Sequence, residues 1–479
     1  MDVNEIKILE STNLKNALLK LNNTGLGTLF VVNDQEELVG VVTDGDIRRA
    51  ILNDFKLESS VFEIMNVAFI SMPFDADSSL ILEKLDDKVK VIPLIDNKKR
   101  LVDYSSKNKV RRISVASPLL NGNEIAYVTE CIKTNWISSQ GKFVKQFESI
   151  FSSYHENKNS LAVSNGTVAL HLALESLGIG KGDEVIVPDL TFAASINAII
   201  YAGATPVLVD VDSLSWNMDV SQIEELISKK TKAIMPVHLY GLPCDMEKIM
   251  SIAKKFNLLV IEDCAEALGS FYKNKPVGTF GDVATFSFYG NKTITTGEGG
   301  MLVFKDPLVA ERASILRDHG MSKNKRYWHD VVGYNYRLTN IQAAIGVAQF
   351  ERLDEFVSAK KTNGNFYNQL FSNLDFFDIP LQSSDSINSY WLYTCLVKKS
   401  APFTRDQLID FLQQRGVETR PVFYPMHLMP PYINYIKKPL VNSIDISQRG
   451  ISFPSSVNLS SLEMEYIKKS VYSFVEQYK

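Results

Sequence analysis

Short β-rich runs alternate with helical patterns through most of this chain, and this alternation constrains its fold more than any other feature. From about residue 160 the β-rich runs are SLAVS, DEVIVP, TPVLVDVD, KAIMPVHLY, LLVIED, DVATFSF and GGMLVF. Most are separated by helical patterns such as VALHLALESLG and CDMEKIMSIAKKF. The alternation predicts an α/β fold with a mainly parallel sheet and helices on both faces. Ligands of such sheets bind beyond the carboxyl ends of the strands, so the loops after the strands should carry the chemistry.

The length of the chain calls for more than one domain. At roughly 150 residues per domain, 479 residues correspond to about three domains. We expect a separate module at residues 1–110, a large domain at 113–350 and a small α+β domain at 351–479. The polar segment SSKNKVRR, residues 105–112, is the predicted linker.

Composition and charge exclude several classes of protein. Hydrophobic residues make up 45% of the chain and charged residues 22%, which is typical of globular proteins and not of disordered or coiled-coil ones. A net charge of -4 argues against a nucleic-acid partner. The start, MDVNEIKILESTN, is polar and no long apolar run follows, so we expect no membrane partner and a cytoplasmic location. The cysteines are scattered, which predicts reduced thiols and no metal site; they are Cys131, Cys244, Cys264 and Cys395.

An internal repeat marks the first hundred residues. The run VVND followed by LVGVV returns 63 residues later as LIDN followed by LVDYS. A helical apolar pattern precedes each copy: Leu14, Leu18 and Leu21 in the first, and Leu80, Leu82 and Leu85 in the second. After the first copy comes a predicted helix, DGDIRRAIL, with Asp44 as its expected N-cap.

This arrangement, and TLFVVNDQEELVGVVTDGDIRRAIL in particular, resembles a pair of cystathionine-β-synthase-type (CBS) domains, which often bind adenine nucleotides. In such modules a hydroxyl residue and an aspartate three positions later commonly hold the ribose, and Thr43 and Asp46 occupy those places. The second copy has Ser106 and Lys109 there. The resemblance therefore implies a regulatory nucleotide at the first copy. The alternative is that Thr43 and Asp46 only cap a helix, in a structural or dimerising module.

Two loops of the larger unit hold polar groups directly after predicted strands. Residues 164–167, SNGT, lead into a helix, and the free N–H groups of a helix start suit a phosphate; an ordinary helix cap is the alternative. Glu262 and Asp263 follow the fifth strand. A carboxylate in such an apolar setting is costly to bury unless it is paired, although it too could simply cap a helix.

The third loop, FSFYGNKTITTGEGGM, places Lys292 between a strand and a glycine-rich turn. A lysine in an enclosed apolar setting loses part of its proton affinity and becomes a usable nucleophile. The three loops together supply a phosphate cup, a carboxylate for a pyridinium nitrogen and an amine for a Schiff base. Those are the groups that pyridoxal phosphate requires.

The ordered motifs SNGT, TFAAS, IEDCAEALGS, FSFYGNKTITTGEGG and GYNYRLTNIQAAIGVAQ resemble the DegT-type nucleotide-sugar aminotransferases of fold type I, from about Ile113 to Lys479. The resemblance implies a pyridoxal-phosphate transferase fold with a small C-terminal domain. Lys292 would bind the cofactor aldehyde, and Asp263 would hold the pyridine nitrogen. The remaining implied cofactor contacts are Phe192 on the ring, Gly166, Thr167 and Ser287 at the phosphate, Glu266 near the ring hydroxyl, and Asn335 at the phosphate site of the neighbouring subunit. The expected working unit is thus a homodimer with shared active sites, a higher oligomer remaining open.

The same resemblance implies amino transfer from L-glutamate to a nucleotide-linked ketosugar. Relatives that dehydrate sugars replace the lysine with histidine, and this chain keeps Lys292. The segments HGMSKNKRYWHDVVGYNYRLTN, ETRPVFYPMHLMPPY and GISFPSSVNLS resemble the branch that aminates C4 of GDP-4-keto-6-deoxy-D-mannose. The candidate substrate contacts are His319, Tyr327, Trp328, Arg337, Arg420 and His427.

Alternatives stay open at this point. Tyr327 and Trp328 could instead pack in an interface, and Arg420 could close a domain contact. The sugar could be another GDP-, UDP- or dTDP-linked ketosugar. The protein could also be a sensor that uses the aminotransferase fold without catalysis. A sensor would normally carry a DNA-binding module, and no basic helix-turn-helix segment is apparent in the sequence, so we favour the enzyme.

Overall fold

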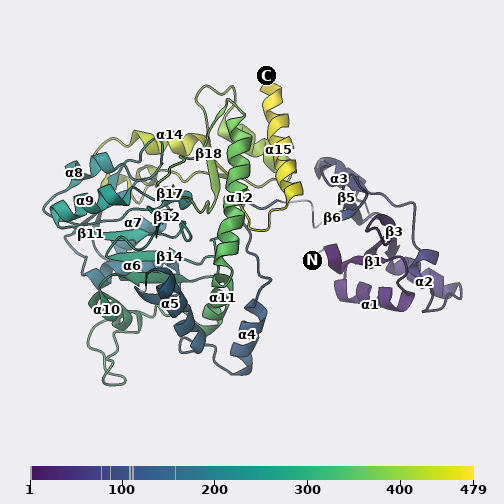
Figure 1. Ribbon diagram of the computed structural model, residues 1–479, viewed down its shortest axis with the longest axis horizontal. Helices are drawn as coiled ribbons and strands as arrows, with labels where there is room; N and C mark the ends of the chain where they lie inside the picture. The colour runs from purple at the N-terminus through teal and green to yellow at the C-terminus, as the bar shows by residue number, and fades with distance from the viewer. Residues whose placement is uncertain are drawn as a thin grey trace. The chain divides into compact units, whose positions relative to one another are not determined.

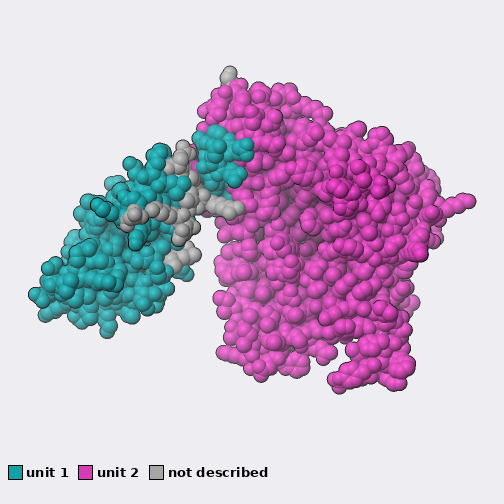
Figure 2. Space-filling model, turned by 180° about the vertical axis from the view of Figure 1, so that it is seen from behind, with its two compact units in different colours: residues 1–113, 410–417 teal, residues 114–409, 418–479 magenta. Residues whose placement is uncertain are grey.

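The computed structural model describes residues 3–76, 78–86, 88–106, 109, 113–156 and 158–478. It divides the chain into two compact units, one of Met1–Ile113 and Asp410–Val417 and one of Ser114–Ile409 and Glu418–Lys479 (Figure 2). Residues 107, 108 and 110–112 of the predicted linker lie outside the described residues. The domain limits given above remain predictions.

The first unit contains two three-stranded sheets built on one plan. Its strands are β1 (Lys7–Leu9), β2 (Thr28–Val32), β3 (Leu38–Thr43), β4 (Met72–Pro73), β5 (Val91–Ile95) and β6 (Leu101–Ser106). The α-helices of its N-terminal segment are α1 (Leu14–Thr24), α2 (Asp44–Leu52) and α3 (Ser78–Lys84). In both sheets the first strand pairs parallel with the second, and the second pairs antiparallel with the third. Thr28 pairs with Thr43, and 63 residues later Val91 pairs with Ser106, so the repeat seen in the sequence is confirmed in the hairpins.

Two local predictions for this unit were wrong. Ile81 is buried in α3, and Leu85 is buried directly after the helix, whereas Leu80 and Leu82 are 49% and 45% exposed. A helix seven residues long buries a narrow stripe, and in α3 that stripe passes through Ile81 and not through the two leucines beside it. The N-cap of α2 is Thr43 and not Asp44, which is the first helical residue.

The second unit is built on a seven-stranded sheet. Its strands are β7 (Asn159–Val163), β8 (Glu184–Pro188), β9 (Thr205–Val209), β10 (Thr231–Ile234), β11 (Leu259–Asp263), β14 (Val283–Ser287) and β15 (Gly300–Phe304). They lie in the order β7-β15-β14-β11-β10-β8-β9. Strand β15 is antiparallel to both of its neighbours, and the other pairs are parallel. The predicted mainly parallel sheet is therefore confirmed.

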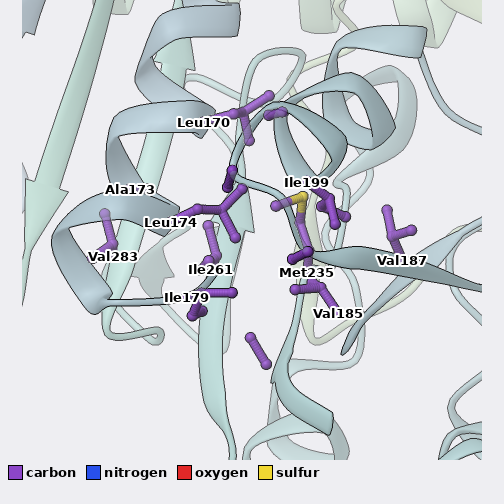
Figure 3. Packing of buried hydrophobic residues seen from close by; sticks show 14 of the residues in the cluster. Leu170, Ala173, Leu174, Ile179, Val185, Val187, Ile199, Met235, Ile261 and Val283 are labelled. Atoms are coloured by element: carbon purple, nitrogen blue, oxygen red, sulfur yellow. The ribbon is translucent and has the colours of Figure 1, made fainter. Parts of the chain in front are cut away.

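Helices cover both faces of this sheet, as Figure 1 shows. The helices of this part are α4 (Glu124–Lys133), α5 (Lys142–Tyr154), α6 (Gly166–Leu177), α7 (Ala193–Tyr201), α8 (Ile223–Leu226), α9 (Met246–Phe256), α10 (Pro307–Arg317) and α11 (Asn340–Phe350), and α4 packs on α11. Successive residues of a strand point to opposite faces. In β11, Ile261 packs with Leu170 and Leu174 of α6 (Figure 3), whereas Val260 packs with the cluster that contains Ile249 of α9.

The C-terminal part forms a smaller α+β layer. Its elements are α12 (Leu353–Ser372), β16 (Phe377–Asp378), β18 (Tyr393–Val397), α13 (Arg405–Gln414), β19 (Arg420–Pro421), α14 (Val441–Arg449), β20 (Gly450–Phe453) and α15 (Ser461–Val475). The four strands form an antiparallel sheet in the order β16-β18-β20-β19, and α12 packs against β16 and β18 (Figure 1). Three short strands form a further sheet: β12 (Phe271–Tyr272), β13 (Lys275–Pro276) and β17 (Ser386–Ile387). In the described part of the chain, no helix has the length and apolar character needed to cross a membrane.

Candidate active site

A cavity of about 690 Å³ lies where β7, β8, β11 and β14 end. The loops after these strands line it, together with Trp391, Arg420 and Phe423 of the C-terminal part. The three loops singled out in the sequence thus meet in one cavity. Parallel strands bring their carboxyl ends to one edge of the sheet, which explains why segments so far apart in the chain meet there.

One wall of the cavity is the start of helix α6. Asn165 is the N-cap, and its side chain accepts a hydrogen bond from the backbone N–H of Val168 at 3.0 Å. The N–H groups of the first helical turn therefore point toward the cavity with the positive end of the helix dipole. A Cβ added to Gly166 would lie 2.8 Å from the Cβ of Ser287, so only glycine lets this hydroxyl stand beside the helix start. The wall suits a phosphate group.

Asp263, the last residue of β11, forms the floor and is 4% exposed. One carboxylate oxygen accepts from the Ser195 hydroxyl at 2.8 Å, and the other accepts from the backbone N–H of Ala265 at 3.1 Å. Burial raises the pKa of Asp263, and the hydrogen bond from Ser195 opposes that shift. A cation bound beside this carboxylate would reverse the balance and keep the carboxylate ionised.

The neighbouring Glu262 points to the other face of the strand and is completely buried. Its oxygens accept three backbone N–H groups, including those of Gly278 at 2.9 Å and Gly281 at 2.7 Å, and lie 3.2 Å from His238 Nε2. Burial acts to raise the pKa of Glu262, but the hydrogen bonds from His238 and these N–H groups outweigh burial and lower it. Neither Glu262 nor Asp263 caps a helix, so that alternative is wrong.

His238 Nδ1 accepts a hydrogen bond from the backbone N–H of Cys244 at 3.0 Å, which places the ring proton on Nε2 beside Glu262. His238, Glu262 and Cys264 lie within 4.8 Å of one another, a spacing that a metal ion could use. The carboxylate of Glu262, however, already receives four hydrogen bonds. We therefore interpret the group as an anchor that fixes the end of β11, and with it Asp263.

Lys292 extends into the same cavity, and its side chain is 13% exposed. Its Nζ lies 3.6 Å from a carboxylate oxygen of Glu266 and 3.7 Å from the ring centroid of Trp391. Burial lowers the pKa of Lys292, while the carboxylates of Glu266 and Asp263 oppose that shift. Burial also raises the pKa of Glu266 to about 7. In this cavity burial therefore shifts both the amine of Lys292 and the carboxyl group of Glu266 toward their neutral forms.

Trp391 and Phe423, which the sequence did not single out, line another wall of the cavity together with Phe192, and Tyr240 packs behind them. Trp391 stacks on Tyr240 at 6.0 Å, Tyr240 stacks on Phe423 at 5.6 Å, and Phe423 lies 5.9 Å from Phe192. The indole N–H of Trp391 donates to the carbonyl of Asn291, the residue before Lys292, at 2.8 Å. The aromatic-rich run SYWLYTCLV and the motif TFAAS contain two of these rings, but only the fold shows that they face the cavity.

The cavity collects most of the predicted cofactor residues and few of the predicted substrate residues. Those that line it are Gly166, Thr167, Phe192, Asp263, Glu266, Ser287, Lys292 and Arg420. Those outside the lining are His319, Tyr327, Trp328, Asn335, Arg337 and His427. Tyr327 and Trp328 are 74% and 52% exposed, and Arg337 pairs with Asp318 at 2.8 Å.

The structure gives His427 a different partner from the predicted substrate. Its Nδ1 lies 2.7 Å from a carboxylate oxygen of Asp189, and its backbone N–H donates to the other oxygen at 2.9 Å. Asp189 is fully buried and also accepts from the Ser443 hydroxyl. His427 therefore satisfies a buried carboxylate, a contact that no local sequence pattern reveals.

In the first unit, Thr43 and Asp46 hydrogen-bond to each other. The Thr43 hydroxyl accepts from the backbone N–H of Asp46 at 3.2 Å, and the Asp46 carboxylate accepts from the backbone N–H of Thr43 at 2.8 Å, which forms a capping box at the start of α2. The Thr43 hydroxyl also donates to this carboxylate at 2.6 Å. In the second copy, Lys109 pairs with Asp103 at 2.6 Å, and its backbone N–H donates to the Ser106 hydroxyl. The capping role left open above is confirmed, and nucleotide binding remains a prediction.

Comparisons with known proteins agree with this geometry. The model of the DegT/DnrJ/EryC1/StrS aminotransferase family matches residues 118–472, and the CBS domain model matches residues 1–53. A GDP-perosamine synthase of Escherichia coli O157:H7 is 50% identical over 76% of this chain and 99% of its own. A GDP-perosamine synthase of Caulobacter vibrioides is 49% identical over 74% of this chain and 96% of its own.

Solved structures give the same result. The aminotransferase TlmJ of Streptoalloteichus hindustanus superposes with a TM-score of 0.72 at 31% identity, over 76% of this chain and 99% of its own. The putative sugar aminotransferase Spr1654 of Streptococcus pneumoniae, in its PMP form, superposes with a TM-score of 0.72 at 28% identity, over 76% of this chain and 98% of its own.

The fold, the residues of this cavity and the family match together identify a pyridoxal-phosphate-dependent transferase. The chain belongs to the DegT/DnrJ/EryC1/StrS aminotransferase family and carries a CBS domain at its N-terminus. Pyridoxal 5'-phosphate is the cofactor of this family, and the glycine-lined helix start, the buried carboxylate and the enclosed amine of this cavity fit it. The CBS match ends at residue 53, so the second repeat rests on the matching hairpin registers.

Proposed function

We propose that this protein transfers the amino group of L-glutamate to C4 of GDP-4-keto-6-deoxy-D-mannose and so makes GDP-perosamine for surface polysaccharide such as O-antigen. The observation that carries the proposal is the 50% identity to a GDP-perosamine synthase over 99% of that enzyme, combined with the amine of Lys292 in the cavity. A relative named for a dTDP-3-amino sugar is 38% identical, which favours the GDP-linked substrate.

The residues that would hold the cofactor are those of the cavity walls. When bound, pyridoxal 5'-phosphate supplies an electron sink that stabilises the charge left when a bond to Cα breaks. Gly166 and Thr167 would hold its phosphate at the start of α6, with Ser287 beside them. Asp263 would hold the ring nitrogen in its protonated form. Glu266 would lie near the ring hydroxyl of the cofactor, and Phe192 would stack against the face of its ring.

Lys292 is the proposed proton carrier. Among the described residues that line the cavity, Lys292 carries the only amine. Burial lowers the pKa of Lys292, which favours the neutral amine that would accept the proton from Cα of glutamate. The same Nζ would return a proton to C4 of the sugar in the second half-reaction. Trp391 covers this amine at 3.7 Å and limits the access of water to it.

Arg420 is the proposed anion contact inside the cavity, where its guanidinium can face a carboxylate or the diphosphate. The candidates outside the lining are assigned to the active site of a second copy: His319, Tyr327, Trp328, Asn335 and Arg337. Their segment includes Val332, which is 92% exposed, and the exposed rings of Tyr327 and Trp328. Burying such apolar surface against a second copy would be favourable. We propose a homodimer whose two active sites each use residues of both subunits.

A nucleotide at Thr43 and Asp46 is the proposed regulator of this activity or of assembly. Its support is the ribose-binding pattern in the segment that matches the CBS model. Equilibrium dialysis of the full chain with adenine and guanine nucleotides tests this point, and absence of binding by all of them would end it.

Coupled assays test the central proposal. The holoenzyme is supplied with glutamate and separately with GDP-, UDP- and dTDP-linked 4-keto-6-deoxy sugars, and products are identified by mass spectrometry. We expect amination of the GDP sugar and none by Lys292→Met. Preferred amination of a UDP- or dTDP-linked sugar would show that the substrate is not the GDP-linked sugar. No amination of any sugar would favour a sensor without catalytic activity.

Mixed dimers test the shared site. Lys292→Met and Asn335→Ala are each expected to be inactive, and mixing equal amounts after dissociation should restore about a quarter of wild-type activity, because half of the dimers contain one intact site. No recovery in a verified mixed dimer would place Asn335 outside the partner's site.

A further inference from the structure

A buried lysine outside the cavity has no acidic partner. Lys360 lies on α12 and is 3% exposed. None of the ion pairs between described residues includes it. Its Nζ donates instead to two main-chain carbonyls, that of Trp391 at 3.0 Å and that of Ser455 at 2.9 Å. Burying an amine without a counter-charge costs free energy of folding, so the presence of a lysine at this position needs a physical explanation.

The position of Lys360 in its helix shows that an apolar residue would fit there. Leu353, Phe356 and Tyr367 lie on the same buried face of α12 at helical spacing. A methionine would fill a similar volume without the desolvation cost. Burial lowers the pKa of Lys360 to about 7. A neutral amine has two N–H groups, and the two carbonyls accept both of them.

Two other residues of α12 also hold the segment at residues 454–456. Asn363 donates to the carbonyl of Ser456 at 2.9 Å, and the hydroxyl of Tyr367 donates to the carbonyl of Pro454 at 2.8 Å. This attachment therefore does not depend on Lys360 alone. Of these three side chains, Lys360 is the one that also reaches Trp391.

Trp391 connects this hydrogen bond to the cavity. Its ring centroid lies 3.7 Å from Lys292 Nζ, and its indole N–H donates to the carbonyl of Asn291 at 2.8 Å. The ring is therefore fixed on two sides: from the lysine loop through Asn291, and from α12 through the main chain held by Lys360. A small displacement of a group that positions reacting atoms can change a rate by orders of magnitude.

We propose that Lys360 is a positioning residue, which holds the main chain of Trp391 so that the indole covers the amine of Lys292. The inference rests on the proposed function, because it assigns Lys360 a part in presenting the lysine that the reaction uses. Lys360 acts through Trp391 and touches neither cofactor nor substrate.

The test uses full-length variants and two readouts. Lys360→Met removes both hydrogen bonds, and Asn363→Leu is the matched control, because it removes one bond from the same helix to the same segment without contact to Trp391. The first readout is the reactivity of Lys292 in cofactor-free protein, measured by competitive acetylation with acetic anhydride and peptide mass spectrometry. The second is the rate at which glutamate bleaches the visible band of the holoenzyme.

We expect Lys360→Met to admit water to Lys292, raise the apparent pKa of its amine toward the ordinary value and slow the bleaching about tenfold. Asn363→Leu should leave both readouts within about twofold of wild type. In a Trp391→Leu background, Lys360→Met should add no further change, because the ring through which it acts is gone. Equal effects of Lys360→Met in both backgrounds, or of Lys360→Met and Asn363→Leu, would overturn the proposal.

Two further outcomes separate this inference from the proposed function. If Lys360→Met does not fold, Trp391→Leu carries the test, and an unchanged reactivity of Lys292 in that variant would overturn the proposal. If wild-type holoenzyme shows no bleaching by glutamate, the proposed function fails, whereas the acetylation readout still decides whether Lys360 and Trp391 control the amine.

Discussion

The two units differ in how their carboxylates meet neighbouring polar side chains: by direct hydrogen bonds in the first unit, and at a longer distance inside a cavity in the second. In the first unit, Thr43 and Asp46 satisfy each other at 2.6 Å at the start of a helix. In the second unit, Lys292 Nζ and a carboxylate oxygen of Glu266 lie 3.6 Å apart in a cavity, and burial raises the pKa of Glu266 to about 7. Polar groups that hydrogen-bond to each other stabilise a fold. Polar groups that are buried without such bonds lower the stability, but they remain free to bind a ligand.

Replacing Lys292 by Met should have the largest effect. Loss of the amine removes both the covalent attachment of the cofactor and the proton carrier, so we expect amino transfer to fall by at least about a thousandfold. The melting temperature of the cofactor-free protein should not fall, because a desolvated amine is replaced by an apolar side chain. Turnover assays and thermal unfolding check the two parts. A clear loss of stability would contradict the view that the amine of Lys292 is buried at a cost in stability.

Asp263→Asn should have the next largest effect. The amide can keep the contact with Ser195, which lies 2.8 Å from the carboxylate, but it carries no charge for the ring nitrogen. We expect the rate to fall about a hundredfold with little change in fold. Single-turnover bleaching by glutamate measures the rate, and circular dichroism controls for structure. A variant with the wild-type rate would remove Asp263 from the proposed role.

The pH dependence of stability sharpens the comparison within the second unit. The pKa of Lys360 is lowered to about 7 in the folded chain and returns to about 10.4 on unfolding. Between these values the unfolded chain binds a proton that the folded chain does not, so this group makes the free energy of unfolding rise with pH. Lys360→Met should therefore gain about 1.4 kcal/mol relative to wild type for each unit that the pH falls from about 10 to about 7. Denaturant unfolding across this range measures the difference, and a constant difference would refute the lowered pKa.

Thr43→Ala should have the smallest effect. It removes the reciprocal cap of α2, which costs about 1 kcal/mol of stability in comparable helices. The visible absorbance of the cofactor should stay unchanged, since Thr43 lies outside the cavity lining. Hydrogen exchange of α2 and the absorbance spectrum check both statements. A change in the spectrum would show that the helix cap at Thr43 affects the cofactor site, which this prediction excludes.

Much of the fold could be predicted from sequence because its signals are local. All seven strands of the large sheet coincide with the β-rich runs to within one residue, and Asp263 and Lys292 lie in short motifs at or just after the ends of strands. For α3 the apolar pattern pointed to Leu80 and Leu82, which are exposed, and missed Ile81, which is buried. The local sequence pattern predicts the position of a helix or strand more accurately than it predicts which residues of that element are buried.

Long-range partners could not be predicted in this way. Trp391 contacts Asn291 from 100 positions away, and Ser195 contacts Asp263 from 68 positions away. The contact between His427 and Asp189 could not be predicted for the same reason, since the two residues are 238 positions apart. Lys360 did leave a signal, because it is a lysine on the apolar face of a helical pattern, but its carbonyl partners appear only in the fold.

The most direct test of this account is to treat the purified holoenzyme with borohydride and to sequence its labelled peptide by mass spectrometry. The account predicts a pyridoxyl group on Lys292, with the label lost when glutamate is added first. A label on another lysine, or none in a protein that contains the cofactor, would contradict it.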